Sequence, residues 1–208
     1  MKIHEYGNPN ADIVLLQPIG EHNLSSIEKE LSLITELTGK KVCWIGFQVE
    51  SWNRDLSPWA SPAVFGNDDF GNGAADTLKE ILKYCIDPDK TYYLGGYSLA
   101  GLFALWAAYQ TDAFDGIAAV SPSMWFPDFD AYMAGHELRS RQIYLSLGDK
   151  EEKTRNPVMR TVGDRTRAAY EKLKARNVDC FLEWNPGNHF REPELRTAKG
   201  FSWLINIS

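Results

Sequence analysis

The chain has 208 residues, of which 44% are hydrophobic and 24% charged, and its formal net charge is −6. These values are those of an ordinary globular protein, and they exclude intrinsic disorder, a coiled coil and a collagen-like fibre. A chain of this length buries enough surface to fold as a single domain over residues 1–208 without a metal or disulfide to stabilise it. An acidic sequence without a clustered basic stripe also disfavours nucleic acid and anionic membranes as partners.

Features that would direct the chain out of the cytosol or to a metal are missing from the sequence. The opening residues, MKIHEYGNPNADIVLLQ, contain no apolar run long enough for a signal peptide or a membrane span. The three cysteines, Cys43, Cys85 and Cys180, are far apart and form no C-x-x-C pair. This usage is typical of reduced thiols. We therefore expect a cytoplasmic protein with no metal ion and no cofactor; the oligomeric state stays open.

Short apolar runs alternate with helix-forming segments along the whole chain. The expected strands are residues 13–17, 42–47, 91–94, 117–120, 143–147 and 178–184. The expected helices are a segment capped by Ser25 and ending before Gly39, then residues 74–85, 99–109, about 157–176 and 193–205. Strands that are apolar throughout, alternating with helices, predict an α/β fold with a mostly parallel central sheet and helices on both faces.

Between the second and third of these strands, residues 48–73 form the longest irregular stretch, rich in Trp, Asp, Asn, Pro and Gly. A loop this long is usually functional or contains short elements. Trp52 and Trp59 lie in it, and Trp125 lies in another segment that reads as a loop. Such aromatic residues either cover the core or form the wall of a substrate cleft, and the sequence leaves both interpretations open.

The segment GYSLA at positions 96–100 lies between an apolar strand and a wholly apolar helix. This context is that of a nucleophile elbow, a sharp turn that projects a serine clear of the sheet. The elbow requires small residues two positions before and after the serine, and here the later one is Ala100 followed by Gly101. We interpret Ser98 as a nucleophile; the structural alternative is a serine that caps the helix.

A serine becomes a useful nucleophile only when a histidine removes its proton. Of the four histidines, His4 lies near the terminus on an expected edge strand and His136 in a polar surface stretch. His189 follows the last expected strand, in NPGNHF, where this fold places its base. His22 follows the first expected strand, where it could line the cleft.

The acid that orients the histidine should follow the penultimate strand. Asp149, Glu151 and Glu152 lie there, and their spacing alone does not rank them.

The oxyanion of acyl transfer needs two N–H donors. The first is expected from Leu99, the residue after the serine, and the second from the loop after the first expected strand. Because Pro18 has no N–H, the second donor would be Ile19 or a backbone group nearby.

Four segments together resemble a family of known proteins. They are GGYSLAGLFAL, VSPSMWF, LSLGDKE and GNHF, in this order along the chain. The sequence from residue 12 to 205 resembles the esterase D and enterochelin-type siderophore esterase family of α/β-hydrolases, and VSPSMWF looks closest to its siderophore-esterase branch. The resemblance implies the α/β-hydrolase fold, with Ser98 as nucleophile and His189 as base.

Further roles are implied by the same resemblance. In the siderophore branch the acid often lies in a G-x-x-E pattern, which ranks Glu151 first, Asp149 second and Glu152 third. Basic residues bind the ligand in several of these enzymes, and Arg54 is the loop candidate here. We therefore expect His22, Trp52, Arg54 and Trp125 to contact substrate.

These observations predict a serine hydrolase that cleaves a carboxylic ester of small or medium size through an acyl-enzyme on Ser98. Two alternatives stay open. An acyltransferase would use the same three residues and pass the acyl group to an alcohol. A non-catalytic binding protein would keep the fold without turnover.

Overall fold

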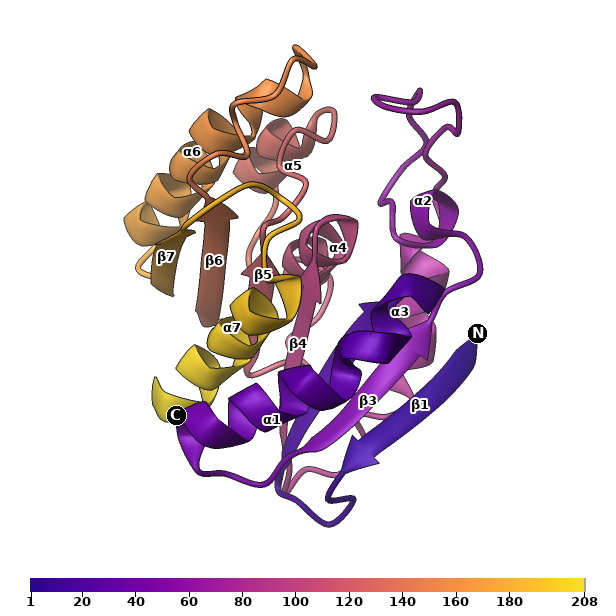
Figure 1. Ribbon diagram of the computed structural model, residues 1–208, viewed down its shortest axis with the longest axis vertical. Helices are drawn as coiled ribbons and strands as arrows, with labels where there is room; N and C mark the ends of the chain where they lie inside the picture. The colour runs from indigo at the N-terminus through magenta and orange to yellow at the C-terminus, as the bar shows by residue number, and fades with distance from the viewer. Residues whose placement is uncertain (208) are drawn as a thin grey trace.

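The computed structural model describes residues 1–207, and within them seven strands form one sheet (Figure 1). The strand order is β1-β3-β2-β4-β5-β6-β7, in which β1 runs antiparallel to β3 and every other neighbouring pair is parallel. The strands are β1 (Lys2–Gly7), β2 (Ile13–Ile19), β3 (Cys43–Gln48), β4 (Thr91–Tyr97), β5 (Gly116–Val120), β6 (Gln142–Gly148) and β7 (Asp179–Asn185).

Helices connect these strands and cover both faces of the sheet. They are α1 (Ile27–Thr38), α2 (Trp52–Asp55), α3 (Ala74–Leu82), α4 (Leu99–Ala107), α5 (Phe129–Gly135), α6 (Val162–Ala175) and α7 (Pro193–Ile207), with 3₁₀ turns η1 (Glu21–Ser26) and η2 (Met159–Thr161). None of the helices in the described part of the chain combines the length and apolar content that crossing a bilayer requires.

Apolar residues on the two faces of each strand explain why both faces are covered. Along β2, Val14 and Leu16 pack into one hydrophobic cluster with α3, α4 and α6, while Leu15 packs into a second cluster with α1 and α7. In Figure 1, α1 and α7 lie in front of the sheet. Helix α4 is buried over its whole length, as its apolar sequence predicts. The predicted mostly parallel sheet with helices on both faces is confirmed.

The strand order reverses between β2 and β4, since the chain steps from β2 to β3 on one side and then crosses to β4 on the other. The β2–β4 ladder ends at the Leu16–Leu94 pair, and beyond it β2 pairs only with β3. Pro18, which has no N–H to donate, lies in this part of β2, where the ladder to β4 has ended. Ligands of open α/β sheets bind at such a reversal, beyond the carboxyl ends of the strands.

One local prediction is wrong, and short elements lie in segments for which the sequence predicts no regular structure. Ser25 does not cap a helix; it lies in η1, which continues directly into α1. The irregular stretch 48–73 contains α2 and an isolated bridge between Ser61 and Phe70, and α5 follows β5. Elements as short as α2 and α5 span one or two turns, too few residues for a periodic pattern to be detected.

A buried carboxyl group on α1 predicts a pH-dependent stability. Glu30 is only 5% exposed, and burial raises its pKa to about 8, although hydrogen bonds from Gln17 and Trp44 partly oppose this rise. Folding therefore favours the protonated acid, and the stability that this group contributes is present below about pH 4.5 and is lost as the pH rises through 8.

We expect the change in the free energy of unfolding caused by Glu30→Gln to be more stabilising at pH 8.5 than at pH 4.5, by on the order of 4 kcal/mol. Urea unfolding at the two pH values measures this difference. Glu28→Gln, which changes an exposed glutamate on the same helix, is the control and should show no such dependence. Equal effects of Glu30→Gln at both pH values would contradict the prediction.

Candidate active site

Ser98 occupies a sharp turn between β4 and α4. Its backbone angles, φ 60° and ψ −121°, lie in a region that L-residues rarely adopt. The strand and helix approach closely there: a Cβ on Gly96 would lie 2.6 Å from the Ala100 carbonyl carbon, and one on Gly101 would lie 2.9 Å from the Gly96 oxygen. Small residues at these positions allow the turn that exposes the Ser98 side chain.

Three polar side chains from distant segments touch in series beside this turn. The Ser98 Oγ lies 3.0 Å from the His189 Nε2, and the His189 Nδ1 lies 2.6 Å from the Glu151 Oε2. The residues follow β4, β7 and β6 respectively, all at the carboxyl edge of the sheet. Ser98 and His189 are partly exposed, whereas the Glu151 side chain is only 4% exposed. The geometry is that of a nucleophile, a base and an orienting acid.

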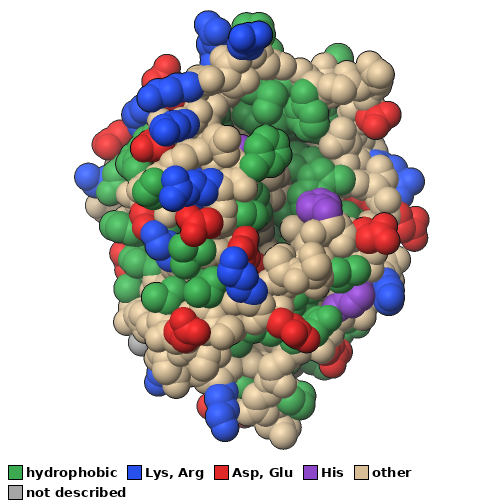
Figure 2. Space-filling model, viewed as in Figure 1, with side chains coloured by type: hydrophobic (Ala, Val, Ile, Leu, Met, Phe, Trp, Pro, Cys, Tyr) green, Lys and Arg blue, Asp and Glu red, His purple; other side chains and the backbone are tan. Residues whose placement is uncertain are grey.

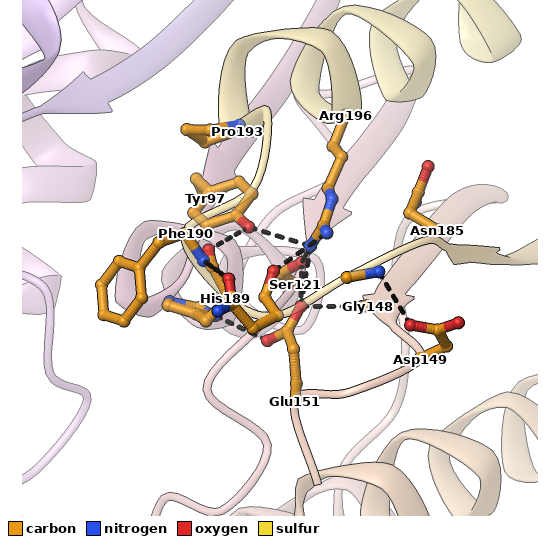
Figure 3. A network of polar contacts seen from close by, with 12 residues as sticks. Tyr97, Ser121, Gly148, Asp149, Glu151, Asn185, His189, Phe190, Pro193 and Arg196 are labelled. Atoms are coloured by element: carbon orange, nitrogen blue, oxygen red, sulfur yellow. Dashed lines mark hydrogen bonds and ion pairs between the residues drawn. The ribbon is translucent and has the colours of Figure 1, made fainter. Parts of the chain in front are cut away.

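The second carboxylate oxygen of Glu151 is bound by three other donors. Its Oε1 accepts hydrogen bonds from the Gly148 N–H at 2.7 Å, the Ser121 Oγ at 2.8 Å and the Arg196 Nη1 at 2.9 Å (Figure 3). Burial alone would raise the pKa of Glu151, but hydrogen bonds and charge from His189, with the Gly148 and Ser121 bonds, bring the pKa below its ordinary value. Glu151 is therefore an anion at neutral pH.

The two other carboxylates of this segment lie elsewhere. The exposed Asp149 accepts the Gly187 N–H on its Oδ1 at 2.7 Å, which ties the segment after β6 to the loop that carries His189. Glu152 pairs with Arg167 of α6 at 3.1 Å. Among the three candidate acids, the contact to the His189 ring is therefore that of Glu151.

The backbone N–H groups of Leu99 and Ile19, the two expected oxyanion donors, differ in where they point. Leu99 is the first residue of α4, where an N–H has no acceptor within the helix. Ile19 pairs with Gln48, and its carbonyl accepts the Val49 N–H at 3.0 Å. Because the N–H and C=O of one strand residue point to the same neighbour, the Ile19 N–H faces β3 and not the β4 side, where Ser98 lies. The structure therefore argues against Ile19 as the second donor.

His22 and Trp52 lie together, with ring centroids 5.3 Å apart in an edge-to-face arrangement. They line a hollow of about 620 Å³ with Gly20, Gln48 and Val49, at the carboxyl ends of β2 and β3. Ser98 and His189 are not part of its lining. Figure 2 shows that this face of the molecule is hollowed in its upper half, with hydrophobic side chains along the walls.

The other two expected substrate contacts are not brought to this hollow. Trp125 is only 6% exposed and packs against Phe65 and Phe70, with ring centroids 5.7 and 5.9 Å apart. Of the two interpretations of this tryptophan, the structure supports a cover for the core. Arg54 is exposed and forms an ion pair with Asp55 at 2.7 Å, and it lines an adjoining hollow of about 500 Å³ that shares Val49 and Glu50 with the first.

Four residues of the site have no role in the sequence analysis, and one of them is Ser121, which donates to the Glu151 Oε1. Arg196 and Tyr97 belong to the network around Glu151 and are described below. Ser123 lies behind the nucleophile, with its Oγ 3.4 Å from the Ser98 Oγ and its N–H donating to the Ser98 carbonyl at 3.1 Å. Its position within VSPSMWF was a signal available in the sequence, whereas Arg196 has no local motif. Within residues 1–207 no group of three His, Cys, Asp or Glu side chains could hold a metal ion.

Comparison of the sequence with family models and with curated proteins finds no match. Comparison of the structure with solved structures finds similar proteins. An IroE-like serine hydrolase from Shewanella oneidensis matches with a TM-score of 0.78 and 17% identity over 98% of this chain and 75% of its own. The siderophore hydrolase EstA from Aspergillus nidulans matches with a TM-score of 0.66 and 20% identity over 99% of this chain and 89% of its own.

A third similar structure is an α/β serine hydrolase without a lid from Xanthomonas campestris, with a TM-score of 0.61 and 16% identity over 99% of this chain and 88% of its own. All three likenesses extend over nearly the whole chain, although identity is low. Together with the strand order and the turn at Ser98, they show that this chain has the α/β-hydrolase fold.

Proposed function

We propose that the protein is a serine esterase that hydrolyses a carboxylic ester of small or medium size. The observation that carries this proposal is the uninterrupted series of contacts from the Ser98 Oγ through both nitrogens of His189 to the Glu151 Oε2. The siderophore hydrolase and the IroE-like serine hydrolase among the proteins of similar structure support the same reaction class. No metal ion or cofactor has a part in this mechanism.

In the first half of the reaction, the Ser98 Oγ attacks the ester carbonyl carbon while the His189 Nε2 takes its proton. The Glu151 carboxylate holds the Nδ1–H and stabilises the imidazolium that forms. The Leu99 N–H, at the positive end of α4, stabilises the oxyanion. The carbon–oxygen bond to the alcohol then breaks, and His189 gives its proton to the departing alkoxide, which leaves an acyl group on Ser98.

Hydrolysis of the acyl-enzyme repeats these steps with water as the nucleophile. His189 takes a proton from water as its oxygen attacks the acyl carbon, and then returns a proton to the Ser98 Oγ as the acid departs. The hollow lined by His22 and Trp52 is the proposed site for a part of the substrate remote from the reacting carbonyl. A small-molecule ester is thus the proposed partner.

A fluorophosphonate probe with mass spectrometry tests the proposal. We expect one covalent adduct, located on Ser98, together with hydrolysis of p-nitrophenyl esters. The control is Ser123→Ala, which removes the neighbouring hydroxyl and should still be labelled at Ser98. Absence of labelling and of hydrolysis in the folded wild-type protein would overturn the esterase and favour a binding protein. Preferential transfer to an added alcohol instead of water would indicate an acyltransferase.

A further inference from the structure

Arg196, on the first turn of α7, extends from the helix into the network around Glu151 (Figure 3). Its side chain is 2% exposed, although arginine is among the residues least often buried. A buried guanidinium is tolerated only where its N–H groups meet acceptors. The acceptors that this one meets therefore indicate what it does.

The two terminal nitrogens of Arg196 contact four separate segments of the chain. The Nη1 lies 2.9 Å from the Glu151 Oε1, 3.2 Å from the Tyr97 hydroxyl and 3.4 Å from the Ser121 Oγ. The Nη2 donates to the carbonyls of Pro186 and Asn188 at 3.1 and 3.0 Å.

Three of these segments carry one member of the triad each, and the fourth contributes Ser121, which shares the Glu151 Oε1 with Arg196. Tyr97 directly precedes Ser98, the carboxylate belongs to Glu151 itself, and the two carbonyls belong to the loop that ends at His189. The Tyr97 hydroxyl also donates to the His189 carbonyl at 2.6 Å, so the base is held from two directions.

We propose that Arg196 is a positioning residue for the triad. Arg196 hydrogen-bonds to the Glu151 Oε1, so the Oε2 of the same carboxylate is free to accept from the His189 Nδ1. Arg196 also holds the carbonyls of the loop before His189, which places the imidazole next to Ser98. Its effect on turnover rests on the proposed esterase function, but its effect on the histidine–glutamate contact does not.

The planar fork of the guanidinium is needed for this role. Arginine has five donors in a rigid arrangement, and here they reach a carboxylate and two carbonyls at once. A lysine in the same place would supply the positive charge to Glu151 but could not hold both carbonyls of the loop. Charge and geometry can thus be separated by substitution.

The kinetic test compares Arg196→Gln and Arg196→Lys with the wild type in ester hydrolysis. We expect Arg196→Gln to lower kcat about 100-fold with KM changed less than about threefold, because a misplaced base slows the chemistry without removing substrate contacts. Arg196→Lys should recover part of this loss. Lys199→Gln, which removes an α7 cation that pairs with Glu183 and Asn185, is the matched control and should leave kcat unchanged.

A second readout needs no substrate. The short, charge-assisted contact between His189 and Glu151 predicts a strongly downfield imidazole proton in the NMR spectrum of the wild type, assigned by its loss in His189→Asn. We expect this resonance to shift or to broaden by exchange with water in Arg196→Gln and to persist in Lys199→Gln.

The outcomes separate the two proposals. The positioning role is overturned if Arg196→Gln folds and either its imidazole resonance or its kcat equals that of the wild type. It is also overturned if the folded variant changes KM but not kcat. If the resonance is perturbed while the wild type shows no hydrolysis dependent on Ser98, the esterase fails and the positioning role holds. If Arg196→Gln does not fold, Tyr97→Phe is the second variant, because it removes the hydroxyl between Arg196 and His189. We expect this variant to lower kcat about three- to tenfold. An unchanged kcat together with an unchanged resonance would overturn the inference.

Discussion

Replacing Ser98 by glycine is expected to abolish ester hydrolysis and at the same time to raise the melting temperature. The hydroxyl is the proposed nucleophile, and its removal typically costs on the order of 10⁴–10⁶ in kcat. The backbone at Ser98 has a φ of 60° and a ψ of −121°, which glycine adopts without strain. Strain of this kind costs about 1–3 kcal/mol, and in a protein of this size each kcal/mol shifts the melting temperature by roughly 2–4 °C.

The alanine variant separates the two effects. Ser98→Ala should lose the same activity but gain none of the stability, because alanine has the Cβ that the turn disfavours. Ser32→Gly, an exposed serine within α1, should lower the melting temperature, since glycine weakens a helix interior. Calorimetry and p-nitrophenyl ester hydrolysis measure both quantities. Retained turnover in Ser98→Gly would contradict the proposed nucleophile, and an unchanged melting temperature would contradict the strain.

The second large effect is expected from Glu151→Gln, which should lower kcat by about 10³–10⁴. The Gly148, Ser121 and Arg196 donors would hold the amide oxygen at the Oε1 position, so the amide NH2 would face the His189 Nδ1. This favours the wrong tautomer, and a neutral amide cannot stabilise the imidazolium. The Ser98–His189 contact itself is left in place. Because the change also removes the charge partner of Arg196, we expect a lower melting temperature, and rates are measured at a temperature where circular dichroism shows the fold intact.

Two isosteric variants serve as controls for the choice of acid. Asp149→Asn keeps an oxygen that can accept the Gly187 N–H, and Glu152→Gln changes a partly exposed pair with Arg167. Each should alter kcat by less than about fivefold, because exposed or neutral contacts are worth about 1 kcal/mol or less. A loss in Asp149→Asn as large as that in Glu151→Gln would move the role of the acid to Asp149.

Local sequence patterns predicted the elements on which the site is built. Ser98 could be proposed as the nucleophile because the elbow is a local motif whose small neighbours and flanking apolar segments are all visible within about fifteen residues. His189 followed from its place after the last strand. Spacing alone did not rank the three candidate acids, since which carboxylate faces the imidazole depends on the turn after β6.

The remaining features depend on contacts between distant segments. The direction of the Ile19 N–H follows from the register of β2 on β3, and a shift of one residue would reverse it. Arg196 lies 45 residues from Glu151 in an ordinary helical sequence, so nothing local marks it. Trp125 reads as a loop residue, but its ring packs against Phe65 and Phe70, which belong to a different segment.

The reversal of strand order between β2 and β4 has a consequence for how this molecule can be altered. Ser98, Glu151, His189 and Arg196 all come from the part of the chain that follows the reversal, whereas the hollow lined by His22 and Trp52 comes from the part before it. The proposed reacting groups and the proposed site for the remote part of the substrate therefore belong to consecutive stretches of sequence. A chimera that exchanges the N-terminal stretch would therefore change the lining of this hollow while it keeps Ser98, Glu151 and His189 together in one unaltered stretch.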